Sequence, residues 1–469
     1  MALDRKSDPG QRTPPRAAPV SITPPPAPLG LWQAFRTARR NVLEIVPAAA
    51  YREPIVMGGR GGRVRWRMLM DPPWVEHVLK TRAQDYPRSD VTRRLLAPRE
   101  GQSLFTADWA EWRWQHRAMT PIFQHRNIVG LSSVMTESAE ATAARMADAV
   151  ARAPGEPVDV YEEMVTATFD VINDTALSGR ESLDRATIST AITRFIETQA
   201  KVSFLDILGA PGWIPRPERM FGWGAKRIDQ MIDRIIAARR ERGPGGKPDL
   251  LDLLIAAEDP DTGRRMTPVE LRNNLMAFIV AGHETTALAL SWALYLLAFD
   301  PEEQASVRTA AQSALGDRAA TAEDVPALGP VRQVIEEALR LYPPAGFLSR
   351  TALTEDEIAG VPVRKGETVM IPVYAMHRNS LLWDAPDTFR PSRFSAAGKE
   401  GRHRYAHLPF GAGPRICIGM SFALMEATII LATLVARFDF GAVAGREPEP
   451  RMVLTLRPQG GLPLRVRRL

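Results

Sequence analysis

The stretch "LPFGAGPRICIGMSFALMEA", residues 408–427, contains Cys417, the single cysteine among 469 residues. Glycines and a proline precede the cysteine, and the apolar run "GMSFALMEATIILATLVARF" after it predicts a strong helix. Cys417 therefore lies at or just before a helix N-terminus, where backbone N–H groups and the helix dipole favour a thiolate. Gly411 and Gly413 allow a close backbone approach or a positive φ in the loop before it.

Three interpretations of this thiol follow from the residues alone. A lone cysteine is most often an inert, buried small residue, but a glycine–proline loop at a helix start argues against that role. A nucleophilic cysteine needs a base; His403 and His407 are near in sequence, but no protease-type signature surrounds them. The third interpretation is a thiolate ligand of haem iron.

The bulk composition is that of a globular protein, with 45% hydrophobic residues, 24% charged residues and 39 prolines. One cysteine excludes a disulfide within the chain, which fits a reducing cytoplasm. The net charge of +6 comes with scattered arginines, so nucleic acid is a weak candidate partner. No window approaches the roughly 20 apolar residues of a membrane span, and the N-terminus lacks the apolar core of a signal peptide. We expect a soluble cytoplasmic protein without a transmembrane segment.

The chain divides into an arm and one large domain. Residues 1–30, rich in proline, arginine and serine, predict a disordered or extended arm. Residues 31–469 read as a single, mostly helical domain with minor strands near both ends; "GRVRWRML", residues 62–69, alternates with a period of two and predicts a half-exposed strand. Residues 201–223 carry apolar side chains among prolines and glycines, which fits either a lid over an apolar cavity or a loop packed on the core.

A long helix is predicted from residue 268. Thr267 can cap it and Glu270 completes a capping box, so the pattern runs to Phe299. From Leu275 onward the sequence is apolar nearly all round, which places this helix in the protein interior.

The middle of that helix carries an irregularity. "GHETT", residues 282–286, puts small and polar residues into the apolar rod, and such groups cost stability unless they are satisfied. A tolerated kink accounts for one such residue, whereas five predict a functional notch. Gly282 and Thr285 share a face, so the notch can hold a small polar molecule and relay protons through Glu284 and Thr285.

Glu337 and Arg340 lie three residues apart in "VRQVIEEALRLYPP", a predicted helix. Most pairs at this spacing are weak surface pairs. Arg393 in "DTFRPSRF" is a candidate third member, and a buried carboxylate bridging two guanidiniums forms a structural clamp.

Three motifs together carry a family resemblance. "FGAGPRICIG", residues 410–419, fits Phe-Gly-x-Gly-x-Arg-x-Cys-x-Gly at every fixed position and resembles the haem-binding loop of the cytochrome P-450 superfamily of haem-thiolate monooxygenases. "AGHETT" resembles its oxygen-activating helix, and "EALR" resembles its Glu-x-x-Arg motif with "RPSRF" as the arginine partner. Ser392 stands where the family often has glutamate. Order and spacing agree over roughly residues 109–440, and the resemblance is weak upstream.

The resemblance implies a mainly α cytochrome P-450 fold with small β-sheets, and haem b as the cofactor. Cys417 would be the axial metal ligand, whose electron donation favours O–O cleavage. Within residues 112–117, His116 is the first candidate for contact with a haem propionate, and Arg117 is the alternative to it. Glu337, Arg340 and Arg393 would be structural. The implied haem-contacting residues are Cys417, Arg415, Arg350, Trp112, His116, Phe410 and Gly411.

Glu284 and Thr285 resemble the acid–threonine pair that delivers protons during dioxygen activation in true monooxygenases. The resemblance therefore implies insertion of one oxygen atom of O2 into an apolar substrate. The motifs occupy the chain to its end, so we expect a separate ferredoxin or flavoprotein reductase as electron donor. A haem-thiolate peroxygenase or isomerase, and a non-catalytic haem sensor, are the alternatives.

The motifs are closer to the fatty-acid-hydroxylating bacterial members and their microsomal relatives than to the camphor-type enzymes. This favours a fatty acid or another long apolar molecule, with terpenoids also open. One of Arg88, Arg93 and Arg94 could anchor a substrate carboxylate, although solvated arginines are the plainer interpretation. Candidate pocket walls, assigned by position, are Phe204, Leu205, Ala281, Ala345 and Phe347. Candidates for a face that docks an acidic donor are Arg113, Arg126, Arg402 and Arg404.

Overall fold

The structure is a computed structural model of the chain and describes residues 18–60, 63–90, 92–93, 102–177, 225–243 and 248–469. Its helices are α1 Leu31–Arg40, α2 Pro72–Glu76, α4 Trp109–Met119, α5 His125–Arg152, α6 Val160–Leu177, α9 Ala225–Arg242, α10 Leu250–Ala256, α11 Pro268–Phe299, α12 Pro301–Leu315, α13 Gly329–Leu341, α14 Val373–Met376, α15 Ala396–Lys399 and α16 Met420–Arg437. Its strands are β1 Ile55–Arg60, β2 Arg63–Leu69, β3 Val158–Asp159, β4 Leu348–Thr351, β5 Asp356–Ile358, β6 Val361–Val363, β7 Thr368–Ile371, β8 Phe438–Gly441, β9 Glu449–Met452, β10 Leu456–Gln459 and β11 Pro463–Arg468.

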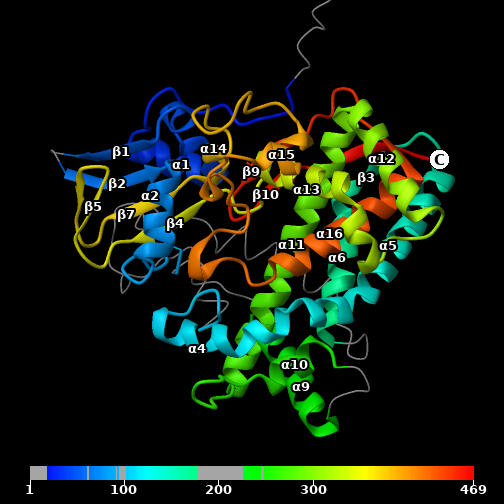
Figure 1. The fold of residues 1–469 in the computed structure, drawn as a ribbon, viewed down its shortest axis with the longest axis horizontal. Coiled ribbons are helices and arrows are strands. Elements are labelled where there is room, and N and C mark those ends of the chain that lie inside the picture. Colours follow the sequence, from blue (N-terminus) through cyan, green and yellow to red (C-terminus); the bar gives the residue numbers. More distant parts are fainter. Residues whose placement is uncertain (1–17, 61–62, 91, 94–101, 178–224, 244–247) are drawn as a thin grey trace, which may run out of the picture.

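Helix α11 runs through the middle of the molecule (Figure 1). It packs along α6 and also contacts α13 and α16, while the sheet that contains β1 and β2 lies on the opposite side from α5 and α12 (Figure 1). The predicted capping box is confirmed: the Thr267 hydroxyl accepts from the Glu270 N–H at 3.3 Å, and the Glu270 carboxylate accepts from the Thr267 N–H at 2.8 Å. The helix ends at Phe299, as the sequence predicts.

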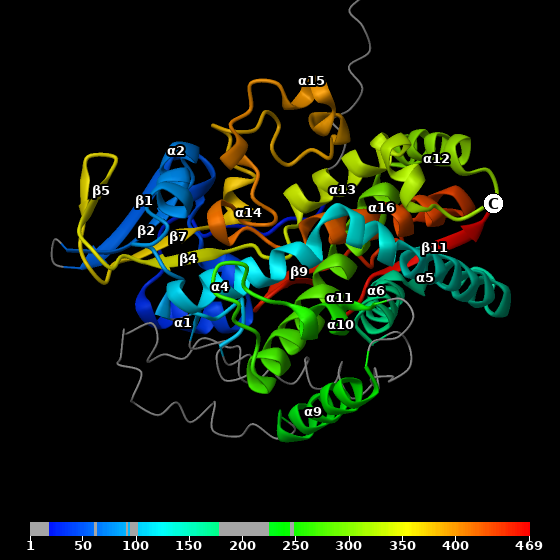
Figure 2. The same ribbon diagram turned by 60° about the horizontal axis from the view of Figure 1, so that its bottom comes forward.

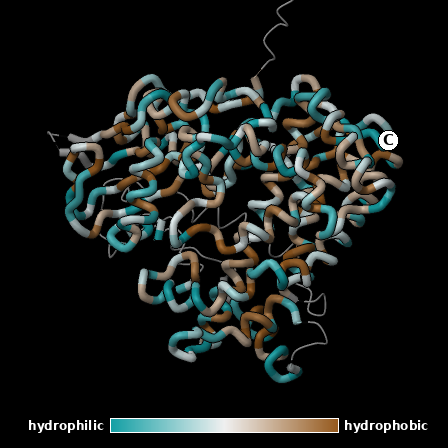
Figure 3. The backbone as a smooth tube through the Cα atoms, in the orientation of Figure 1, coloured by the Kyte–Doolittle hydropathy of each residue, from teal (hydrophilic) through white to brown (hydrophobic). Residues whose placement is uncertain are grey.

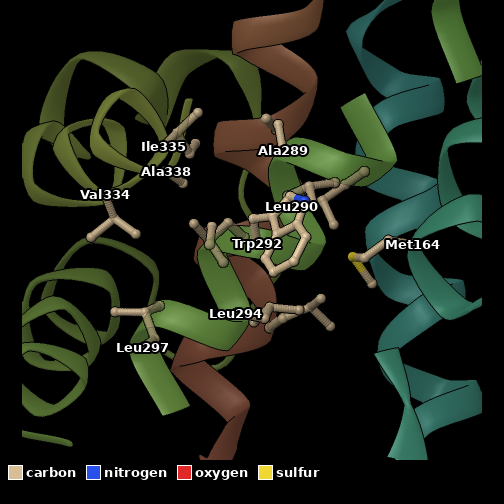
Figure 4. Close-up of a cluster of buried hydrophobic side chains, with 14 of the residues drawn as sticks. Met164, Ala289, Leu290, Trp292, Leu294, Leu297, Val334, Ile335 and Ala338 are labelled. Carbon is tan, nitrogen blue, oxygen red and sulfur yellow. The ribbon is translucent and has the colours of Figure 1, made fainter. Parts of the chain in front are cut away.

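The core around α11 is built on Trp292, which is fully buried. Its ring stacks on Tyr342 with 4.1 Å between centroids, and its indole N–H donates to the Leu456 carbonyl at 3.0 Å. Figure 4 shows Trp292 between Met164 of α6 and the aliphatic side chains of α13. The large aromatic ring thus joins helices α6, α11 and α13 and the hairpin of β9 and β10 in one cluster.

Apolar stretches lie mainly inside the helical part of the molecule, and hydrophilic ones follow its periphery (Figure 3). Among the described residues, α11 and α16 are long and apolar enough to cross a membrane by length and composition. In both helices, 72% of the apolar window is buried within the protein, which is the arrangement of core helices.

Four strands form the largest sheet, in the order β1-β2-β7-β4, with β2 and β7 parallel. The strand predicted at residues 62–69 is present as β2, but its arginines do not all face solvent. Arg67 is fully buried and donates to Glu367 at 2.8 Å and to the Pro362 carbonyl at 2.8 Å. The expectation of an exposed arginine face is wrong there, because a carboxylate 300 residues away in sequence neutralises the charge.

The second half of the N-terminal arm contacts the core. Residues 18–30 form no helix or strand, and Ile22 is buried. The Val20 N–H donates to the Tyr295 hydroxyl at 3.1 Å, and the Tyr342 hydroxyl donates to the Val20 carbonyl at 2.6 Å. The Ile22 N–H donates to the Tyr374 hydroxyl at 3.1 Å. Three buried tyrosines therefore hold a segment that has no packing signal of its own.

Glu337, Arg340 and Arg393 meet in the interior. Arg340 pairs with Glu337 through two hydrogen bonds of 2.7 and 2.8 Å, and both side chains are 0% exposed. The Arg393 Nε lies 3.4 Å from the same carboxylate. Arg340 also donates to the carbonyls of His377 at 2.8 Å and Pro386 at 2.6 Å, which ties the chain after β7 to α13.

Replacing Glu337 by glutamine should lower the free energy of unfolding by about 3–5 kcal/mol, because two guanidiniums then lie buried without their shared anion. The adjacent Glu336 gives a matched control, since it pairs with Lys399 near the surface. Glu336→Gln should cost less than about 1 kcal/mol. Urea unfolding of both variants checks this, and equal losses would contradict the role of the buried network.

Candidate functional site

The loop before α16 holds Cys417 in a fixed position. The Cys417 N–H donates to the Phe410 carbonyl at 2.9 Å, and the Gly411 N–H donates to the Leu408 carbonyl at 3.0 Å. Gly411 and Gly413 have φ of 70° and 72°, as the sequence predicts for glycines in this turn. A Cβ on Gly413 would lie 1.8 Å from the Leu79 carbonyl oxygen, so only glycine lets the two backbones approach.

The thiol of Cys417 is accessible to solvent, although protein atoms surround it closely. Burial among these atoms raises the pKa of the thiol. The backbone N–H of Gly419 and the positive charge of Arg88 oppose this rise. Helix α16 starts at Met420, three residues further on, with Gly419 at its N-cap. The side chain therefore opens to one side of an otherwise dense loop and lies within the field of Arg88.

Arg88, Arg350 and Arg415 form a cluster of positive charge beside this thiol. Arg88 pairs with Arg350 through an antiparallel backbone bridge at the edge of β4. Burial, then repulsion from Arg88 and Arg415, lowers the pKa of Arg350 to about 9. Burial, then repulsion from Arg88, lowers the pKa of Arg415 to about 9. The guanidiniums are charged at neutral pH, and their crowding in a buried site favours an added anion.

Helix α4 adds aromatic side chains to the cluster. The Arg415 guanidinium lies 4.8 Å from the ring centroid of Trp112, and this ring lies 4.7 Å from that of His116. Burial, then the charge of Arg415, lowers the pKa of His116. Arg117 instead forms two hydrogen bonds of 2.7 Å with Asp259. The geometry therefore places His116, and not Arg117, with the arginine cluster.

His377, which the sequence reading did not single out, links the Glu337 network to the thiol loop. Its Nδ1 lies 3.2 Å from the Arg340 carbonyl, and its Nε2 accepts from the Leu408 N–H at 2.8 Å. Burial, then the positive charge of Arg340, lowers its pKa to about 3, so the ring is neutral and bridges donor and acceptor. No local pattern in the sequence marks this histidine, because its two partners lie 37 and 31 positions away.

Helix α11 continues without a break through the residues of the predicted notch. Ala281 is the one residue between Leu271 and Phe299 that is exposed, and Thr285 beside it is half-buried. The Thr285 hydroxyl donates to the Ala281 carbonyl at 2.7 Å, the back-bonded arrangement that local helix widening requires. Gly282 faces α6, where a Cβ would lie 3.1 Å from the Ile172 side chain, so the glycine allows close packing of the two helices. A small accessible polar patch thus interrupts a buried helix.

Glu284 points elsewhere. It is buried, and its carboxylate forms an ion pair with Arg457 of β10, whose side chain is 24% exposed. Both Glu284 and Thr285 belong to the described part of the chain, and no hydrogen bond joins their side chains. Arg457 is a residue that sequence reasoning missed, because 173 positions separate it from its partner.

The remaining expected site residues differ in exposure and in surroundings. Ala345 is exposed, and Phe347 is half-buried against two core clusters. Phe410 is half-buried against the main core. Arg88, considered above as a substrate anchor, belongs to the arginine cluster. Phe204, Leu205, Arg94 and the segment 201–223 lie outside the described residues.

Comparison with known proteins identifies the family. The model of the family "Cytochrome P450" matches residues 24–464. The chain is 33% identical to cyclooctatin synthase of Streptomyces melanosporofaciens over 397 residues, 84% of each chain. It is 33% identical to a bifunctional cytochrome P450/NADPH–P450 reductase of Bacillus cereus over 371 residues, 76% of this chain and 34% of that protein.

A solved structure gives the same answer. The cytochrome P450DA heme domain superposes with a TM-score of 0.76 at 28% identity, covering 88% of this chain and 90% of that one. The chain belongs to the cytochrome P450 family, has its fold, and binds haem b. The family model also begins well upstream of residue 109, so the weak N-terminal resemblance is a matter of sequence divergence and not of fold.

The residues present fit this group. Haem b carries two propionates, and the crowded guanidiniums of Arg350 and Arg415 favour added negative charge. An accessible thiol at a helix start suits iron, which takes thiolate as an axial ligand. Trp112 and His116 supply further ring N–H groups on the same side as Arg415.

Replacing Arg350 by glutamine should speed haem loss by about tenfold or more, because a charge-assisted contact is removed. Transfer of haem to excess apomyoglobin measures the rate. Arg113→Gln, an exposed arginine of α4, is the control and should leave the rate unchanged.

The choice between His116 and Arg117 can be tested in the same assay. Arg117→Gln breaks the pair with Asp259 and should lower the melting temperature while leaving haem loss as in wild type. His116→Gln should speed haem loss while leaving the melting temperature as in wild type. Faster haem loss in the Arg117 variant would contradict the assignment.

Proposed function

We propose that this cytochrome P450 is a monooxygenase that inserts one oxygen atom of O2 into an apolar organic substrate, a fatty acid or terpenoid-like molecule. Haem ligated by thiolate supplies dioxygen activation and O–O cleavage when electrons reach it. The observation that carries the proposal is the notch in α11, where Thr285 and Ala281 are accessible in a helix that is otherwise buried. A haem protein that only senses needs no such polar patch.

The Cys417 thiolate would hold the haem iron, with the Cys417 N–H held by the Phe410 carbonyl and its loop fixed by Gly413 against Leu79. Arg350, Arg415, Trp112 and His116 are the proposed propionate contacts. Thr285 holds a proton at its hydroxyl oxygen and can turn from the Ala281 carbonyl to donate it across the notch. The other oxygen atom leaves as water.

Glu284 supplies protons through its pair with Arg457 in this proposal. The guanidinium of Arg457 provides the ion-pair partner of this buried carboxylate. Because Arg457 is 24% exposed and Glu284 is buried, the pair connects the interior of α11 to solvent. Thr285 then receives protons by way of water, as no direct bond joins it to Glu284.

The proposed electron donor is a separate ferredoxin or flavoprotein, and the proposed location is the cytoplasm. Arg113, Arg126 and Arg404 are exposed and suit an acidic docking partner. Arg402, also named from the sequence as a docking candidate, is removed from this proposal. It is half-buried and donates to the carbonyls of Arg393 and Gly398 at 2.7 Å. Reversing its charge would disturb the fold as well as docking.

Two measurements test the proposed function. The reduced protein with carbon monoxide should show the strongly red-shifted Soret band of thiolate-ligated haem, and Cys417→His should move the band to the imidazole position. With a substrate that shifts the resting spectrum, ¹⁸O₂ should label the product with one atom. Thr285→Ala should form several-fold less product per O2 consumed. Turnover without O2 or electron donor would instead indicate an isomerase or a peroxide-dependent enzyme.

Replacing Arg457 by glutamine should lower turnover several-fold, because the buried Glu284 carboxylate loses its ion-pair partner and with it the link to solvent. Product formed per unit time with a fixed electron donor measures the effect. Arg451→Gln is the control, since this β9 arginine contacts the Arg40 carbonyl and Gln459 instead. Equal turnover in the two variants would remove Glu284 from the proton path.

A further inference from the structure

A second basic site lies beside α15 and the turn at residues 391–394, at residues that the haem site does not use. A pocket of about 350 Å³ opens there, the lower end of the range for small-molecule sites. Its lining includes Arg390, Arg393, Arg402, Ser392, Trp383 and Asp384. Figure 2 shows α15 and the neighbouring loop at the edge of the molecule.

The walls of this pocket are fixed by close packing. A Cβ on Gly398 of α15 would lie 2.3 Å from the Ser392 carbonyl oxygen, so α15 rests directly on the turn at residues 391–394. The Ser395 hydroxyl caps α15 by accepting from the Gly398 N–H at 3.0 Å. The Arg402 guanidinium lies 4.4 Å from the ring centroid of Trp383. The pocket is therefore formed before any ligand arrives.

The residues that line the pocket carry more positive than negative charge. Three arginines and one aspartate line the pocket, and Asp384 is 83% exposed and lies 3.1 Å from Arg390 at the rim. Glu337 lies behind the wall, where Arg340 holds both of its oxygens and the Arg393 Nε lies 3.4 Å from one of them. Burial, then the charge of Arg340, lowers the pKa of Arg393 to about 10, although the charge of Glu337 opposes this shift.

The three arginines also keep donors free. The Nη2 of Arg393 donates to the Ala385 carbonyl, and that of Arg402 donates to the Arg393 and Gly398 carbonyls. The Nη2 of Arg390 donates to Asp384. Within the described ranges, Nη1 of each arginine makes no hydrogen bond to protein. Guanidinium forks with free N–H groups bind phosphate and carboxylate oxygens.

We propose that this pocket binds a small, multiply charged oxyanion with phosphate chemistry, held by Arg390, Arg393 and Arg402 with the Ser392 hydroxyl. The ligand adds negative charge to a wall that carries three arginines and one aspartate. Its binding joins α15 to the chain that Glu337 and Arg340 anchor, and so stabilises the segment that leads to the thiol loop. The proposal does not depend on the monooxygenase reaction.

The test uses the haem-loaded protein, so that the haem-site arginines are already engaged. Inorganic phosphate and pyrophosphate are titrated at constant ionic strength set with chloride, because salt screens weak surface binding. We expect a saturable rise of the melting temperature by a few degrees, with a dissociation constant on the order of 1 mM or tighter. The absence of a saturable response to both anions would overturn the proposal.

A matched pair of variants locates the site. Ser392→Glu places a carboxylate among the three arginines and should weaken pyrophosphate binding by about tenfold or more, whereas Ser392→Gln, of similar size and no charge, should change it less than about threefold. Arg390→Gln alters an arginine that is 45% exposed, so the fold is retained, and should also weaken binding by about tenfold. Equal affinity in the Glu and Gln variants would place the anion elsewhere and refute the assignment.

Discussion

The carboxylate of Glu337 is the group on which the geometry of the functional site depends. It is fully buried and is satisfied by Arg340, by Arg393 and by the Arg390 N–H at 2.9 Å. Arg340 in turn holds the carbonyls of His377, Pro386 and Thr388. A buried network of this kind is costly when incomplete, so its members fix one another's positions.

From this network a continuous path of hydrogen bonds reaches the thiol. The neutral ring of His377 joins the Arg340 carbonyl to the Leu408 N–H, the Leu408 carbonyl accepts from Gly411, and the Phe410 carbonyl accepts from Cys417. The Glu-x-x-Arg helix therefore does more than stabilise the fold. It places the loop that presents Cys417, with the close approach of Gly413 to Leu79 holding the opposite side.

The sequence predicted the features that local chemistry determines. The capping box of α11, the end of that helix, the positive φ of Gly411 and Gly413, and the meeting of Glu337 with Arg340 all depend on residues near one another in the chain. The sequence did not predict contacts made across hundreds of positions: Arg67 with Glu367, Glu284 with Arg457, or the tyrosine hydroxyls that hold residues 20–22. In each of these, a polar residue has its place because of a partner that no local pattern reveals.

The distribution of charge shows the same difference between what the sequence indicates and what the fold determines. A net charge of +6 spread along the sequence indicates only a basic surface. The fold gathers arginines into two groups with different surroundings: Arg88, Arg350 and Arg415 beside the thiol, and Arg390, Arg393 and Arg402 beside α15. Burial and repulsion from neighbouring guanidiniums lower the pKa of Arg350 and Arg415 in the first group, and of Arg393 and Arg402 in the second. For the first group the propionates of haem b are the natural counter-charge. The second group has Glu337 and Asp384 as partial counter-charges within the protein, and an anion from solution is the further ligand that we propose for its free guanidinium donors.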